Sequence, residues 1–232
     1  MNSNEYYDDF YEDEYAAQEP EYVSIPLPFL VIVVILVLVF ILSRVEVNLQ
    51  ASTSDSVILA ESATSGNVIA PLFTPEVQYW SENIAAWSEQ TGIDPNLIAT
   101  VMQIESCGDP RARSSAGAMG LFQVMPYHFE SGEDPYKPAT NAHRGLNYLK
   151  QALDARSGVA RLGLAGYNGG ITGAQRPESQ WASETQRYVY WGSGIYEDAV
   201  NGTSTSERLD EWLGRGGASL CAQAAQRLGL QP

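Results

Sequence analysis

Basic residues are scarce in this chain of 232 residues, which carries 13 Lys and Arg against 28 Asp and Glu and a formal net charge of −15. No stretch gathers Lys or Arg into a cluster. Because nucleic-acid binding relies on basic patches that neutralise phosphates, this composition argues against a nucleic-acid partner.

Histidine and cysteine are also scarce, with two of each: His128, His143, Cys107 and Cys221. They lack the close Cys/His spacing of a zinc site, and two histidines make a His-based catalytic triad a poor explanation. We therefore expect no metal and no cofactor.

The cysteines allow two interpretations. A bridge between Cys107 and Cys221 would close a loop of more than 100 residues. Such a bridge is stable only in an oxidising compartment, which fits a domain outside the cytoplasm. The alternative is two separate buried thiols. We favour the disulfide.

The first 24 residues contain no Lys or Arg, and the first basic residue is Arg44. Residues 1–22 hold eight acids and five tyrosines. A segment so charged and so poor in aliphatic residues cannot form a core, so residues 1–24 are predicted to be a disordered acidic tail. A tail that binds an unknown partner is the alternative.

An uncharged apolar run follows, and residues 25–43 are predicted to be a transmembrane anchor. As a helix, the 18 residues from 25 to 42 would cover about 27 Å, close to the thickness of a hydrocarbon core. A cleaved signal peptide is the alternative, but the run has no basic segment before it. Residues 44–74, rich in Ser, Thr, Ala and Val, are predicted to be a linker.

Strand-like alternation and internal repeats are missing, and helical periodicity begins near residue 75. Asp94-Pro95 is typical of a helix N-terminus, and the apolar helix that it opens reaches Glu105. Further helices are expected over residues 141–153, with Asn141 as the cap, and over 159–166, 181–199, 207–213 and 220–228. The fold class is therefore mainly α, with the domain spanning residues 75–232.

The stretch 104–126 reads IESCGDPRARSSAGAMGLFQVMP. It places Glu105 where an apolar helix meets a Ser/Gly/Ala-rich loop, a setting that favours a raised carboxyl pKa. This stretch resembles the first two motifs of the soluble lytic transglycosylase domain, which belongs to the goose-type, lysozyme-like branch of peptidoglycan-cleaving enzymes. LAGYNGG at 164–170 and ETQRYV at 184–189 resemble the third and fourth motifs, in the same order.

The resemblance implies a lysozyme-like catalytic domain with its motif core at 94–199 and a helical extension at 200–232. It implies cleavage of the β-1,4 MurNAc–GlcNAc bond with Glu105 as the single acid/base and 1,6-anhydro-MurNAc as the product end, which makes the enzyme a lyase. It also implies substrate-binding roles for Ser114, Gln123, Met125, Tyr167, Asn168, Glu184 and Tyr188.

Each of these residues also has a simpler interpretation. Ser114, Gln123 and Asn168 are residue types that satisfy loop backbones, Tyr167 and Tyr188 are ordinary core residues, and Glu184 suits the first turn of a helix. Two functional alternatives keep the same site: a muramidase that uses water, and a catalytically silent domain that binds peptidoglycan.

The expected location is the cell membrane, with one membrane pass and the catalytic domain on the cell-wall side. Arg44 would weakly favour the opposite orientation by the positive-inside rule. The cysteines and the peptidoglycan substrate both place the domain outside, and we follow them.

Overall fold

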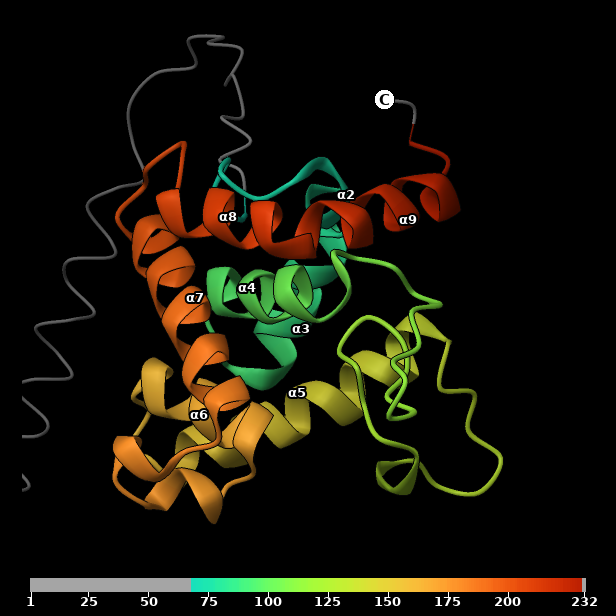
Figure 1. Cartoon of the computed structure of the whole chain (residues 1–232). Coiled ribbons are helices and arrows are strands. Elements are labelled where there is room, and N and C mark those ends of the chain that lie inside the picture. The colour runs from blue at the N-terminus through green and yellow to red at the C-terminus, as the bar shows by residue number, and fades with distance from the viewer. Residues whose placement is uncertain (1–67, 231–232) are drawn as a thin grey trace, which may run out of the picture. The chain divides into compact units, whose positions relative to one another are not determined.

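The computed structural model describes residues 68–230, and Figure 1 shows that they form a helical domain. No β-strand is present in this range apart from isolated bridges in the loop after residue 112. The α-helices are α2 (Pro75–Gln78), α3 (Ser81–Thr91), α4 (Pro95–Ser106), α5 (Pro138–Asp154), α6 (Ala160–Gly169), α7 (Ser183–Val200), α8 (Glu207–Trp212) and α9 (Ala218–Leu228). Short turns lie between them: η1 (Pro126–His128), η2 (Gly173–Gln175), η3 (Glu178–Gln180) and the π-helical η4 (Leu213–Gly217).

Helix α4 lies at the centre of the domain and packs against α2, α3, α7 and α9 (Figure 1). Its start follows the predicted signal, because the Asp94 carboxylate accepts hydrogen bonds from the amides of Asn96 and Leu97. Its end is set by Cys107, which takes a left-handed conformation with φ 52°. The helix is buried over nearly its whole length, so its last turn is rigidly held.

Helices α5, α6 and α7 pack in sequence order and close the core on the other side of α4. The seams are filled by fully buried aliphatic side chains, among them Leu146, Leu149, Leu164 and Ile195. Dense packing of this kind makes a core stiff and hard to compress. The elements around the end of α4 therefore have fixed relative positions.

The C-terminal extension is tied to the end of α4. Cys107 and Cys221 form a disulfide with an S–S distance of 2.00 Å and a Cα–Cα distance of 5.0 Å. The Arg227 guanidinium adds an ion pair, with Nε 2.9 Å from Oδ2 of Asp109. The predicted bridge is therefore present, and it holds α9 beside α4.

Three details differ from the sequence-based expectations. Asn141 does not cap α5, because the helix begins three residues earlier at Pro138 and Asn141 is fully buried inside it. Helix α6 does not stop at the YNGG motif but continues through Tyr167 and Asn168. Residues 69–73, expected in the linker, already contribute Ile69 and Phe73 to the core.

The predicted acidic tail at 1–24, the predicted anchor at 25–43 and most of the linker lie outside the described residues. Between residues 68 and 230, no helix has the length and apolar character needed to cross a bilayer. The anchor at 25–43 stays a prediction.

Candidate active site

Glu105 occupies the last turn of α4 and is partly buried. Burial removes water from the carboxylate and raises its pKa from 4.5 to about 8. The Tyr188 hydroxyl opposes this shift and lowers the pKa, whereas the negative charge of Glu184 raises it slightly. The side chain therefore holds its proton at neutral pH, as the apolar helix before it suggests.

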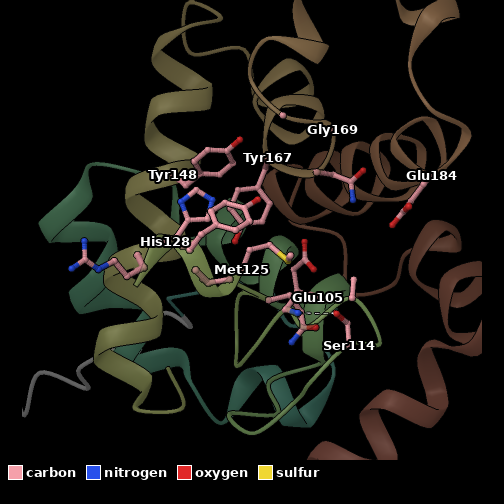
Figure 2. Close-up of a pocket in the computed structure, with 17 residues that line it drawn as sticks. Glu105, Ser114, Met125, His128, Tyr148, Tyr167, Gly169 and Glu184 are labelled. Atoms are coloured by element: carbon pink, nitrogen blue, oxygen red, sulfur yellow. Dashed lines mark hydrogen bonds between the residues drawn. The ribbon is translucent and has the colours of Figure 1, made fainter. Parts of the chain in front are cut away.

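A cavity of about 480 Å³ opens in front of Glu105 (Figure 2). It brings together residues from the loop after α4 and from α5, α6 and α7, which are far apart in the sequence. Of the predicted substrate-binding residues, six line this cavity: Ser114, Gln123, Met125, Tyr167, Asn168 and Glu184. Figure 2 shows Tyr167 and Glu184 on different sides of Glu105.

Ser106 joins the end of α4 to the loop that follows. Its buried hydroxyl donates to the carbonyl of Leu121 at 2.8 Å and accepts from the amide of Gly108 at 3.1 Å. The Glu105-Ser106 pair thus combines an acid that faces the cavity with a neighbour that fixes the loop to the helix.

Ser114 and Gln123 also support the loop that carries them. The Ser114 hydroxyl accepts from the amide of Ala118 at 3.0 Å, and the Gln123 amide donates to the carbonyl of Gly120 at 3.0 Å. Gln123 has φ 45°, so the backbone bends sharply where this side chain meets the cavity. Each side chain keeps hydrogen-bonding capacity for a ligand beyond its loop contact.

Asn141 holds the same loop from α5. Its carboxamide accepts from the amide of Phe122 at 2.9 Å and donates to the carbonyls of Met119 at 2.8 Å and Pro135 at 2.9 Å. Gly120 has φ +75°, and a Cβ there would lie 2.4 Å from the Asn141 amide nitrogen. The glycine therefore allows the loop to approach the amide that braces it.

Tyr167 and Asn168 come from the last turns of α6. The Tyr167 hydroxyl donates to the backbone carbonyl of Phe122 at 2.6 Å, and the side-chain oxygen Oδ1 of Asn168 accepts from the Thr185 hydroxyl at 2.8 Å. Both contacts cross from one element to another, so the two side chains are fixed in place while they line the cavity.

Tyr188 differs from the other predicted residues, because it does not line the cavity. Its side chain is 6% exposed, and burial raises the pKa of its phenol well above 10. The hydroxyl interacts with Glu105 but falls short of hydrogen-bond geometry, and within residues 68–230 it has no hydrogen-bond partner. The structure places Tyr188 against the acid, in a position that does not contact the cavity.

Comparison with known proteins shows the family of this chain. The family model "Transglycosylase SLT domain" matches residues 82–189. The endo-type membrane-bound lytic murein transglycosylase A of Klebsiella pneumoniae (strain 342) is 38% identical over 165 residues, which cover 66% of this chain and 75% of that protein. The chain belongs to the SLT family of lytic transglycosylases.

Other proteins are similar over smaller shares of their own length. The transglycosylase of Enterobacteria phage PRD1 is 39% identical over 111 residues, which cover 47% of this chain and 40% of the phage protein. The chain thus spans less than half of the length of the phage protein. A solved structure of the lytic transglycosylase Slt from Pseudomonas aeruginosa is 19% identical with a TM-score of 0.39, and covers 65% of this chain and 24% of that one.

Beyond the SLT motifs, the structure adds an aromatic row that the sequence did not predict. The rings of Tyr127 and His128 have centroids 4.6 Å apart, His128 and Tyr148 are 5.0 Å apart, and Tyr148 and Tyr167 are 5.9 Å apart. All four residues line the cavity, and Figure 2 shows His128, Tyr148 and Tyr167 on one side of it. Flat ring faces of this kind suit sugar rings. Tyr148 lies on α5, outside every motif, so only tertiary packing reveals it.

Arg144 also lines the cavity of this SLT-family domain and pairs with Glu130 and Glu133, each at 2.8 Å. These ion pairs fasten the loop between η1 and α5 to the helix. Within residues 68–230, one group of side chains brings potential metal-binding atoms together, namely Glu76, Cys107 and Cys221. Its two sulfurs are bonded to each other, so the group offers no thiolates to a metal.

Proposed function

We propose that this chain is a lytic transglycosylase that cleaves the β-1,4 bond between MurNAc and GlcNAc in peptidoglycan. The observation that carries the proposal is Glu105, an acid with a pKa near 8 in a cavity of about 480 Å³. A carboxylic acid that keeps its proton at neutral pH can protonate the oxygen of a leaving sugar. Pure glycan binding would not need such a group.

In the proposed reaction, Glu105 donates its proton to the glycosidic oxygen, and the bond from that oxygen to C1 of MurNAc breaks. The carbonyl oxygen of the substrate's own N-acetyl group stabilises the positive charge that develops at C1. The C6 hydroxyl of the same sugar then attacks C1 and returns its proton to the Glu105 carboxylate. The products are a free GlcNAc hydroxyl and a 1,6-anhydro-MurNAc end, so protons and bonds balance without water.

The other lining residues bind and orient the strand in this proposal. Ser114, Gln123 and Asn168 present fixed polar groups for the N-acetyl and hydroxyl groups of the sugars. Met125 forms an apolar wall, and the aromatic row that includes Tyr167 supports sugar faces. Tyr188 acts as a positioning residue for Glu105. Because hydrogen bonds from Asn141 on α5 and Tyr167 on α6 hold the loop after α4 in place, binding requires little reordering of the site.

A hydrolytic reaction is the second candidate, and Glu184 is the observation that favours it. Glu184 is the other carboxylate in the lining of the cavity, and it is exposed to solvent. A second carboxylate is what a glycosidase needs to activate water. The two reactions differ in their product ends.

The deciding experiment digests purified peptidoglycan with the full-length chain and analyses the product ends by mass spectrometry. Anhydro ends, abolished by Glu105→Gln and retained in Glu184→Gln, support the transglycosylase. Reducing ends that Glu184→Gln abolishes support the muramidase. Binding without cleavage supports the silent domain and contradicts both enzymes.

We also propose that residues 25–43 anchor the chain in the cell membrane with the domain on the cell-wall side. The disulfide supports an oxidising location, and several relatives are named membrane-bound. Protease added to whole cells should degrade the domain. Complete protection in intact cells, with degradation after lysis, would contradict the orientation.

A further inference from the structure

A second hollow, of about 340 Å³, lies beside the first cavity. The two share Glu105, Ser114 and Gln123, so they adjoin at the acid. The second hollow is bounded by the loop that follows α4 and by one face of α9. Three of its lining residues are arginines: Arg111, Arg113 and Arg227.

Helix α9 contributes its side of the hollow through Leu220, Gln223 and Arg227. These residues are spaced i, i+3 and i+7, so they share one helix face. The neighbouring face carries Cys221, which is bonded to Cys107 directly after the α4 helix, and Figure 1 shows α9 crossing near α4. Because the bridge and the Arg227–Asp109 ion pair both join α9 to this region, the hollow has a fixed wall.

The charges in this hollow do not cancel. Asp109 is nearly buried and is matched by Arg227. Arg111 and Arg113 are exposed, and within the described part of the chain neither has a carboxylate oxygen within 4.0 Å of its guanidinium. Glu105, whose pKa is raised to about 8, carries little negative charge at neutral pH. Among residues 68–230, two guanidinium groups of this hollow are therefore unmatched, although the chain carries a net charge of −15.

An arginine fork matches the two oxygens of a carboxylate better than it matches neutral groups. A peptidoglycan strand offers such carboxylates, because each MurNAc carries a short acidic peptide through the lactyl ether on C3. If a strand lies in the first cavity with a MurNAc at Glu105, the first residue of the peptide on that MurNAc lies next to the second hollow.

We propose that the second hollow binds a carboxylate of the peptide attached to MurNAc, with Arg111 and Arg113 as its ligands. This inference rests on the proposed function, and it adds a substrate preference to it. Strands that carry acidic peptides are bound at two points, whereas strands without carboxylates are held by the sugar contacts alone.

The test compares three substrates with the full-length chain: peptide-bearing strands, the same strands with their carboxylates amidated, and strands from which an amidase has removed the peptides. Amidation keeps the shape of the peptide and removes its charge. The removal of the peptide leaves a lactyl carboxylate on the sugar. The three substrates therefore separate the contributions that the peptide carboxylate, the peptide bulk and the lactyl carboxylate each make to kcat/KM.

We expect Arg111→Gln/Arg113→Gln to lower kcat/KM about tenfold or more on the peptide-bearing strands and less than about twofold on the other two substrates. The matched control is Arg187→Gln/Arg215→Gln, which removes two exposed arginines that line neither cavity. The Arg111→Lys/Arg113→Lys variant should restore part of the preference, because it keeps the charge.

Three results would overturn the inference. The first two are an equal fall in kcat/KM on the peptide-bearing and amidated strands, and an unchanged preference for peptide-bearing strands in the Arg111→Gln/Arg113→Gln variant. A fall on the peptide-free strands equal to that on the peptide-bearing strands would assign the site to the lactyl carboxylate and would contradict the peptide. Failure of the wild-type chain to cleave any of the three substrates would contradict the proposed function itself.

Discussion

The hydroxyl of Tyr188 on α7 faces the carboxyl of Glu105 at the end of α4, and each group shifts the pKa of the other. The hydroxyl lowers the pKa of Glu105, against the larger rise that burial causes. Burial, and after it the charge of Glu105, raises the pKa of Tyr188. A phenol that stays neutral near neutral pH can therefore lower the pKa of the acid without changing its own charge.

The first prediction concerns the pH profile of cleavage. A general acid must be protonated, so activity should fall tenfold for each pH unit above the pKa of Glu105, near pH 8. Tyr188→Phe removes a contact that lowers this pKa, so the alkaline limb of kcat/KM should move to higher pH. Tyr190→Phe, an exposed tyrosine on the same helix, is the control and should leave the limb in place. A limb that moves to lower pH in Tyr188→Phe would contradict the assigned contact.

The second prediction concerns stability. The pKa of Glu105 is raised in the folded state, so the folded chain binds the proton more tightly than the unfolded chain. The charge should therefore destabilise the fold progressively as the pH rises from about 4.5 to about 8. Glu105→Gln removes this penalty, so its Tm should equal that of the wild type at pH 4 and exceed it at pH 9. The exposed Glu89→Gln on α3 should show no such trend in the same thermal scans. A difference in Tm between Glu105→Gln and the wild type that stays constant across pH would mean that the Glu105 carboxyl is not desolvated.

The third prediction tests the brace from α5. Asn141→Ala leaves the amide of Phe122 and the carbonyls of Met119 and Pro135 without their partner. Each of these three groups costs about 1 kcal/mol or more when it is left without a hydrogen bond, so the free energy of unfolding should fall by about 3 kcal/mol or more. Urea titration measures this loss. The exposed Asn147→Ala on the same helix should change the free energy of unfolding by less than about 0.5 kcal/mol.

Asn141 also shows where the sequence could not predict the structure. Asn before an apolar helical pattern is typical of a cap, because capping depends on local backbone geometry. Its actual partners lie 6 to 22 residues away along the chain, so no local rule could find them. By contrast, the start of α4 at Asp94-Pro95 and the place of Glu105 in its last turn follow from local signals, and the structure confirms both.

The residues of the candidate site also fall into two groups, those that sequence motifs predict and those that only the structure reveals. Ser114, Gln123, Met125, Tyr167, Asn168 and Glu184 stand in motifs, and the structure brings them to one cavity. The aromatic row was missed because His128 and Tyr148 meet across 20 residues of sequence, and neither position carries a motif. The second hollow was missed because it needs α9, which lies outside the motif core and reaches the site only through tertiary contacts.

The last prediction concerns the disulfide. Cys107 and Cys221 are separated by 114 residues, so the bridge removes a large loop-closure entropy from the unfolded chain. Cys107→Ala/Cys221→Ala should lower the free energy of unfolding by about 3–5 kcal/mol. A reductant should lower the free energy of unfolding of the wild type by a similar amount. The double variant should be insensitive to the reductant, which separates loss of the bridge from general effects of the reagent. Because the bridge also holds α9 beside Arg111 and Arg113, the double variant should lose preference for peptide-bearing strands at temperatures where it is still folded. Equal unfolding curves for the wild type with and without reductant, once both sulfurs are shown to be reduced, would mean that α9 is held by its packing and by the Arg227–Asp109 ion pair alone.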